Sequence, residues 1–384
     1  MPMRTITLLQ PNRLVFGSGC LTNALDYLSA LPQPRIHIVY SASLHSTIDH
    51  LKRQLSTTGI PVTSDRASAG EPTLSSFHAA LERARATEPT CILGIGGGSA
   101  LDLAKLLAAF LHNAQRIEDT FGIGLLRSRN CHLVCIPSTS GTGSEVSPNA
   151  ILLDETAQIK KGVISPCLVP DATFIDPTLT HSVPPAVTAF TGLDALTHCI
   201  EAYTNKHAHS LVDLYALEGI RLCARFLARA THDGNDAEAR EGLSLASLYG
   251  GLCLGPVNTA AVHALAYPLG GEFHIPHGLS NAILLSTVFR FNAAASPERH
   301  ADVALALGAE LKSTPLETAY AGAAQLEALT RTCNIDTNLA HHGIGRNSIS
   351  HLAEAALTVQ RLLSNNPREL TRHDVEQIYA ACFA

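Results

Sequence analysis

A carboxylate and an imidazole lie one helical turn apart in the stretch GLDALTHCIEAY, residues 192–203. Asp194 and His198 are four positions apart, so a helix would point both side chains the same way. The apolar residues around them recur at helical spacing and predict one buried stripe, formed by Leu193, Leu196, Ile200 and Tyr203. A buried carboxylate without a partner is costly, so this helix needs something that offsets the charge.

Two later histidines complete a candidate metal site. His263 and His277 lie on either side of a break rich in proline and glycine within residues 262–292. With Asp194 and His198 they offer one carboxylate and three imidazoles. This set suits Fe(II), Zn(II), Mn(II) or Co(II), and not calcium, which prefers oxygen ligands. Because the chain has 19 histidines, each one alone could equally be an ordinary core or surface residue, and the prediction depends on the set of four.

A run of glycines, GIGGGS at 94–99, follows a strand-like segment and precedes a helix-like one. Glycine lets a ligand approach the backbone closely, and the start of a helix favours a phosphate. The spacing differs from the common G-x-G-x-x-G dinucleotide motif. Ser99 and Asp102 also match an S-x-x-D capping pair, which gives Asp102 a structural role. The alternative is a tight strand-to-helix turn that binds no ligand.

A second loop, within PSTSGTGSEVSPNAILLD at 137–154, follows the strand-like segment CHLVCIP. Ligands of open α/β sheets bind at the carboxyl ends of the strands, where this loop would lie. Its small polar residues could donate hydrogen bonds to a ribose or a pyrophosphate; they include Ser138, Thr139, Thr142 and Asn149. An ordinary turn-rich loop is the alternative, but two such loops after strands of one sheet favour a nucleotide site.

The organisation of the chain changes near its middle. Strand-like and helix-like segments alternate in the first half, whereas amphipathic helical runs dominate after Pro184. With 384 residues, two domains are expected. We predict an α/β domain with a Rossmann-like parallel sheet at 1–182 and an all-helical domain at 183–384, with Pro184-Pro185 as a hinge.

Composition narrows the class of protein. Hydrophobic residues make up 46% and charged residues 16% of the chain, which is typical of a globular protein, and the net charge is −6. No basic patch indicates a nucleic-acid partner. We expect no signal peptide and no membrane span. Ten cysteines without C-x-x-C pairs predict a reduced, cytoplasmic protein with buried thiols.

Four segments, in this order, closely resemble the iron-containing (group III) alcohol dehydrogenase family: GGGSALDLAK, PSTSGTGSEVSP, GLDALTHCIEAY and HALAYPLGGEFHIPHG. The similarity covers nearly the whole chain. It implies a dehydroquinate synthase-like fold, with an N-terminal dinucleotide-binding domain and a helical metal domain. It also implies NAD(P)-linked hydride transfer between a small alcohol and its aldehyde or ketone, in a homodimer or larger homo-oligomer.

Carried over by position, the resemblance assigns one divalent metal to the four residues named above, Asp194, His198, His263 and His277. Fe(II) is the expected metal and Zn(II) the alternative. It assigns the pyrophosphate loop to Gly96, Gly97, Gly98 and Ser99, and further cofactor contacts to Ser138, Thr139, Ser147, Asn149 and Lys160. Thr142 and Asp102, taken from the motifs themselves, complete the predicted cofactor site.

Two positions depart from the common pattern of the family. Many members have an acidic residue after the first strand, where Ser41 stands; a serine does not repel a 2′-phosphate, so NAD and NADP are both expected. Many members have a histidine, often assigned to proton relay, where this chain has Tyr267. Because a tyrosine hydroxyl has a pKa of about 10, His274 is a second relay candidate, unless it is only an exposed loop residue.

Three other functions fit the sequence less well than an alcohol dehydrogenase. A dehydroquinate synthase-like lyase needs basic residues for a phosphorylated substrate, and 262–292 offers little beyond Arg290. A metal-free maleylacetate-type reductase does not need the intact Asp194. A non-catalytic nucleotide-binding protein does not need four intact ligands. The small and apolar residues of 250–290 favour a small, weakly polar alcohol or aldehyde.

Overall fold

The computed structural model describes residues 4–68 and 70–383, which divide into two compact units. The α/β unit consists of Leu9–Thr139 and Gly143–His181. The helical unit consists of residues 182–383 together with 4–8 and 140–142. The last two segments precede the predicted boundary at 182, yet they lie with the helices.

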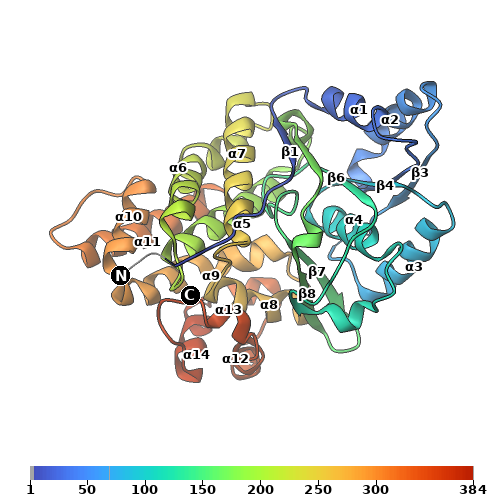
Figure 1. Cartoon of the computed structure of the whole chain (residues 1–384). Helices are drawn as coiled ribbons and strands as arrows, with labels where there is room; N and C mark the ends of the chain where they lie inside the picture. Colours follow the sequence, from blue (N-terminus) through green and yellow to red (C-terminus); the bar gives the residue numbers. More distant parts are fainter. Residues whose placement is uncertain (1–3, 69, 384) are drawn as a thin grey trace. The chain divides into compact units, whose positions relative to one another are not determined.

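The α/β unit is built on a six-stranded sheet in which every neighbouring pair is parallel. The strand order is β1-β9-β6-β4-β2-β3 (Figure 1). The strands are β1 (Arg13–Phe16), β2 (Ile36–Tyr40), β3 (Val62–Arg66), β4 (Cys91–Gly96), β6 (His132–Pro137) and β9 (Ala172–Ile175). The apolar runs of β2, β4, β6 and β9 are buried because helices cover both faces of a parallel sheet. The predicted Rossmann-like parallel sheet is confirmed.

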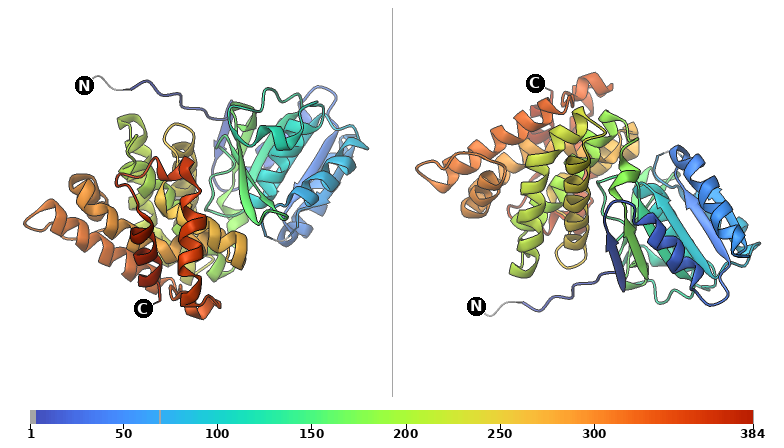
Figure 2. Two further views of the ribbon diagram at one scale, coloured as in Figure 1. Left: turned by 90° about the horizontal axis from the view of Figure 1, so that it is seen from below. Right: turned by 90° about the horizontal axis from the view of Figure 1, so that it is seen from above.

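Four helices cover the two faces of this sheet, as the further views in Figure 2 show. They are α1 (Leu21–Ser29), α2 (His45–Thr57), α3 (Leu74–Arg85) and α4 (Gly98–Phe110). Residues of α1 and α2 join one hydrophobic cluster with the strands, and residues of α3 and α4 join another. The chain therefore leaves the neighbouring strands β2 and β4 across opposite faces. Ligands of such sheets bind at the strand ends where these connections diverge.

A smaller sheet, in the order β5-β8-β7, completes the α/β unit. Its strands are β5 (Gly122–Ile123), β7 (Asn149–Asp154) and β8 (Ile159–Ile164), and β7 pairs with β8 in antiparallel register. Single 3-10 turns link the elements at η1 (Ala42–Leu44), η2 (Ile117–Thr120), η3 (Pro166–Leu168) and η4 (Pro177–Thr180). β7 follows the polar loop that the sequence predicted to face a nucleotide.

The helical unit packs around α5 (Pro185–Thr204), which starts at the Pro184-Pro185 pair. The remaining helices are α6 (Ser210–His232), α7 (Ala237–Leu254), α8 (Ala261–Phe273), α9 (His277–Asn292), α10 (Pro297–Ala306), α11 (Pro315–Thr332), α12 (Ile349–Leu357), α13 (Gln360–Leu363) and α14 (Arg372–Ala381). Every residue of α5 from Gly192 to Thr204 is buried. The predicted stripe of Leu193, Leu196, Ile200 and Tyr203 is buried, but burial extends to the other faces of this part of α5, because neighbouring helices pack around it.

Two further predictions concern the chain as a whole. All ten cysteines are free thiols, and nine of them are buried. In residues 4–68 and 70–383, no helix combines the length and the apolar character that a membrane span needs.

Candidate active site

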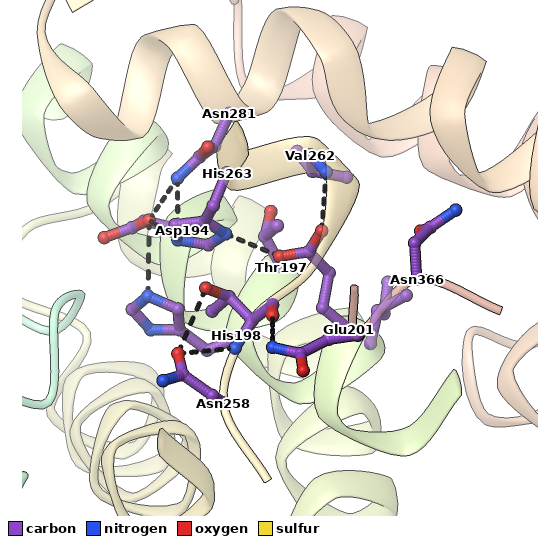
Figure 3. A network of polar contacts seen from close by, with 12 residues as sticks. Asp194, Thr197, His198, Glu201, Asn258, Val262, His263, Asn281 and Asn366 are labelled. Atoms are coloured by element: carbon purple, nitrogen blue, oxygen red, sulfur yellow. Dashed lines mark hydrogen bonds and ion pairs between the residues drawn. The ribbon is translucent and has the colours of Figure 1, made fainter. Parts of the chain in front are cut away.

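Three helices of the helical unit carry the four predicted metal ligands around one carboxylate. Figure 3 shows Asp194, His198 and His263 of this set. Asp194 and His198 lie one turn apart on α5, and His263 lies in the first turn of α8. α8 ends at His274, whose left-handed backbone turns the chain so that α9 begins at His277. The predicted Pro-Gly-rich break was wrong at Pro268, Gly270 and Gly271, which lie inside α8. The turn at residues 274–276 is what lies between α8 and α9.

One oxygen atom is the centre of this group. Asp194 Oδ1 lies 3.7 Å from His198 Nε2, 3.6 Å from His263 Nε2 and 3.7 Å from His277 Nε2. Ligand atoms bound tetrahedrally at 2.0–2.2 Å stand about 3.4 Å apart, close to these three separations. Asp194, His263 and His277 each place a ligand atom within 4.8 Å of the other two, whereas His198 does not belong to this mutual group. The side chains are 2% exposed at Asp194, 5% at His198 and His263, and 26% at His277.

Electrostatics in the group favours the ionised carboxylate. Burial by itself would raise the pKa of Asp194, but the neighbouring histidines hold it well below its usual range. Burial lowers the pKa of His198 to about 4, so this ring is neutral at pH 7. Burial opposes protonation of His263 as well, yet the carboxylates of Glu201 and Asp194 outweigh it and raise the pKa to about 9. Metal binding at His263 would therefore release a proton.

The polar atoms of the group converge on a single donor, the amide of Asn281. Its Nδ2 lies 2.7 Å from Asp194 Oδ1 and 3.1 Å from His263 Nε2 (Figure 3). It also lies 3.4 Å from His277 Nε2. When His263 and His277 are neutral, as metal ligands are, an amide with two hydrogens cannot serve all three acceptors fully. Convergent lone pairs around a buried carboxylate are what a metal cation requires, and the residues present fit one.

Two polar residues of this group were missed by the sequence analysis. Asn281 lies four residues after His277 on α9, and Glu201 lies seven residues after Asp194 on α5. Helical spacing places each on the same face as a predicted ligand. That spacing was the signal that could have revealed both.

The two relay candidates have different surroundings. The ring of Tyr267 stands 6.4 Å from the ring of His277, measured between centroids, and Arg361 donates to its hydroxyl at 3.5 Å. His274 is exposed and ends α8. His274 is therefore the exposed residue that was the alternative to a relay role. Tyr267 is the candidate that lies beside a predicted ligand.

The glycine loop in the α/β unit lies where β2 and β4 diverge. Gly96 ends β4 with a φ of +155°, and Gly97 is the residue before α4. The Gly97 N–H donates to the Ser41 hydroxyl at 3.2 Å, and the Ser138 N–H donates to the Gly96 carbonyl at 2.8 Å. A Cβ on Gly97 would stand 3.3 Å from Thr139 Oγ1. The ends of β2, β4 and β6 thus meet here.

The predicted capping pair at the start of α4 was wrong. Gly97 precedes the helix and no side chain caps it. Asp102 instead accepts hydrogen bonds from the Ser144 hydroxyl at 2.5 Å and from the Ile151 N–H at 2.9 Å. Its carboxylate therefore ties the second loop to α4, which is a structural role of a different kind.

The other predicted cofactor residues are spread over the second loop and the small sheet. Ser147 is buried, and Lys160 is ion-paired with Glu71. Thr142 lies in the short segment that belongs to the helical unit. Asn149 Oδ1 is buried without a hydrogen-bond partner in the described structure, so this acceptor suits a ligand hydroxyl. Gly98 and Ser99 form the first turn of α4.

Two protein-family models match this chain and identify its family. Residues 11–177 match the model of the iron-containing alcohol dehydrogenase, and residues 188–383 match that of the Fe-containing alcohol dehydrogenase family, C-terminal. The chain belongs to the iron-containing alcohol dehydrogenase family. It is thus an alcohol dehydrogenase, as the resemblance predicted, and the lyase and the metal-free reductase are not favoured.

Two relatives show how closely the chain follows other members of the iron-containing alcohol dehydrogenase family. It is 39% identical to long-chain-alcohol dehydrogenase 1 of Geobacillus thermodenitrificans over 318 residues, which cover 82% of this chain and 80% of the relative. It is 31% identical to the 1,3-propanediol dehydrogenase of Klebsiella pneumoniae over the full length of both.

Solved structures of the iron-containing alcohol dehydrogenase family share the fold. A 1,3-propanediol oxidoreductase superposes with a TM-score of 0.93 at 30% identity, covering 99% of this chain and 100% of that one. The sulfoacetaldehyde reductase of Bifidobacterium kashiwanohense, in complex with NAD+, superposes with a TM-score of 0.87 at 26% identity and covers 99% of each chain. The family supports a nicotinamide cofactor and a metal for this chain.

Proposed function

We propose that this alcohol dehydrogenase holds one divalent metal, Fe(II) in the first place and Zn(II) as the alternative, between Asp194, His198, His263 and His277. The observation that carries the proposal is the convergence of three imidazole nitrogens on one oxygen of a buried carboxylate. A carboxylate and three imidazoles suit both metals, and availability decides between them.

When bound, such a metal supplies Lewis acidity that lowers the pKa of an alcohol hydroxyl. The chain's own residues do the rest. The buried helix α5 keeps Asp194 and His198 in place and excludes water from one side of the reacting group. Tyr267, beside His277, is the group we propose for carrying the alcohol proton toward solvent. The hydride passes to the nicotinamide, whose orientation the protein sets.

The nicotinamide cofactor is proposed to bind the α/β unit at the ends of β2 and β4. Gly96, Gly97, Gly98 and Ser99 offer the pyrophosphate an open backbone and a helix start. In this proposal Asn149 Oδ1 accepts a hydrogen bond from the cofactor. The seven other cofactor predictions, which stay predictions, are Ser41, Asp102, Ser138, Thr139, Thr142, Ser147 and Lys160.

Both NAD and NADP are proposed as cofactors. Ser41 brings no negative charge to the end of β2. The strand register pairs Arg66 with Tyr40, the residue just before Ser41. Arg66 is exposed at the carboxyl end of β3. A guanidinium in this position suits a 2′-phosphate.

A small, weakly polar alcohol or its carbonyl product is the proposed substrate. α7, α8 and α9, which span most of residues 250–290, bury many small and apolar side chains. The relatives named above act, by their names, on long-chain alcohols and on 1,3-propanediol. The homodimer and the cytoplasmic location stay predictions.

The metal assignment is tested by stripping the enzyme with a chelator and reloading it with Fe(II) or Zn(II). NAD+ and NADP+ reduction is then followed with a panel of alcohols. We expect His263→Ala and His277→Ala to lose metal and alcohol oxidation while nucleotide binding persists, because the glycine loop lies in the other unit. His341→Ala, which removes an exposed histidine paired with Asp336, is the control. Full activity in a variant shown to be metal-free contradicts the proposal.

A further inference from the structure

A second buried carboxylate lies beside the ligand group. Glu201 is on α5, three residues after His198, and its side chain is 5% exposed. A buried carboxylate needs partners for its oxygens, and both oxygens of Glu201 have one. Those partners belong to a different helix, α8.

Glu201 holds the first turn of α8 at two points (Figure 3). Its Oε1 accepts a hydrogen bond from the Val262 N–H at 2.6 Å, and its Oε2 lies 2.6 Å from His263 Nδ1. The residue before α8, Ala260, has no side chain that could cap the helix. The carboxylate from α5 therefore takes the place of a cap, and its charge suits the positive end of the helix.

The second contact bears on the metal ligand. An imidazole that donates its Nδ1–H to a carboxylate presents the lone pair of Nε2, and such a contact also fixes the orientation of the ring. His263 Nε2 is the atom that stands 3.6 Å from Asp194 Oδ1. The ring of His263 is further held by stacking on His198, with 4.8 Å between centroids.

We propose that Glu201 is a positioning residue, which fixes the tautomer and the orientation of His263 for metal binding. This inference rests on the proposed metal site. The two roles of Glu201 have different consequences. A helix cap affects the stability of α8, whereas a positioning residue also affects the affinity and the ligand field of the metal.

The test compares Glu201→Gln and Glu201→Asp with the wild-type enzyme, each stripped of metal and titrated with Co(II) or Zn(II) against a competing chelator. Glutamine has one acceptor oxygen and no charge, so it cannot accept hydrogen bonds from both the Val262 N–H and His263 Nδ1–H, and we expect metal affinity to fall about 10- to 100-fold. Aspartate keeps the charge but is too short to keep both contacts, so its affinity should lie between the two. The visible spectrum of the Co(II) enzyme should change in the same order.

Thr314→Ala is the matched control. Thr314 caps α11 through the Glu317 N–H, so its loss should lower thermal stability and leave metal affinity and the Co(II) spectrum unchanged. If Glu201→Gln does not fold, Glu201→Asp decides the question alone.

Wild-type metal affinity and an unchanged Co(II) spectrum in either folded Glu201 variant overturn the inference and leave Glu201 as a helix cap. A wild-type enzyme that binds neither Co(II) nor Zn(II) overturns the metal site itself, and this inference with it. The two failures are therefore distinguishable from one set of titrations.

Discussion

The ammonium nitrogen of Lys105 lies 2.8 Å from the carbonyl oxygen of Ser147, deep inside the α/β unit. The same nitrogen donates to the Ser144 carbonyl, also at 2.8 Å, and to the Asn149 carbonyl. Lys105 is fully buried on α4, one turn after Asp102, which binds the same loop. One cation and one carboxylate of α4 thus hold the backbone that leads into β7.

Replacing Lys105 by methionine is expected to destabilise the α/β unit by about 3–5 kcal/mol, because it leaves three carbonyl groups without their donor and the buried Asp102 without a nearby cation. Cofactor affinity should fall as well, since the loop carries Ser147 and Asn149. Lys161→Met, which removes a partly exposed ion pair with Asp154, should cost no more than about 1 kcal/mol. Urea unfolding and cofactor titration measure both; equal effects of the two substitutions would contradict this account.

Gly96→Ala is expected to damage the cofactor loop. Its φ of +155° is rarely adopted by other residues, and an added Cβ would stand 2.2 Å from Ser41 Oγ and 2.9 Å from the Ala100 side chain. We expect a cost of roughly 1–3 kcal/mol in unfolding free energy and weaker cofactor binding. Gly97→Ala meets nothing closer than 3.3 Å and should cost less stability. Thermal unfolding should show Gly96→Ala to be less stable than Gly97→Ala. The reverse order of stability would contradict this prediction.

Cofactor choice should shift with Ser41 and Arg66. Ser41→Asp places a carboxylate at the end of β2 and should weaken NADP(H) use by about 1–3 kcal/mol while sparing NAD(H). Arg66→Ala should weaken NADP(H) use by a similar amount, because it removes the guanidinium beside this strand end. Arg53→Ala, on the exposed side of α2, is the control. The measurement is kcat/KM with NAD(H) and with NADP(H) for the wild type and each variant. A wild-type enzyme that rejects NADP(H) outright would show that other residues set the cofactor preference.

Glu145 should make stability depend on pH. Burial raises the pKa of this carboxyl from 4.5 to about 7, and Lys105 and backbone hydrogen bonds offset only part of the shift. The folded chain then binds more protons than the unfolded chain between these values. Glu145 therefore contributes about 3 kcal/mol to the unfolding free energy below pH 4.5, and this contribution is lost as the pH rises through 7.

Glu145→Gln removes the titrating group. The unfolding free energy of the variant, relative to the wild type, should therefore increase between pH 5 and pH 8. Denaturant unfolding at several pH values measures this difference. A difference that stays constant over the range would show that Glu145 keeps its ordinary pKa.

The sequence predicted the parallel sheet and the start of α5 well, because apolar strand runs and proline pairs act locally. It could not predict that α5 is buried on every side. That burial depends on contacts such as the one that Gly219 allows, where a Cβ would stand 2.4 Å from Cys199 Sγ. Spacing along one helix does not reveal how many neighbours surround it.

The candidate site was predicted where ligand types recur at helical spacing, as for Asp194 and His198. Helical spacing places Glu201 on the face of Asp194, but the role of Glu201, like that of Arg66, depends on partners from other elements. Glu201 binds the start of α8, and Arg66 reaches the end of β2 only through strand register. Asp102 shows the opposite error: a local capping motif was present, but a tertiary contact with Ser144 prevailed.

The four proposed ligands differ in their access to water. Asp194, His198 and His263 are at most 5% exposed, whereas His277, the first residue of α9, is 26% exposed. Gain and loss of the metal should therefore proceed by the swing of the His277 ring, without any opening of α5. The residence time of the metal and its equilibrium affinity are then set by different residues, His277 for the first and the Glu201–His263 pair for the second.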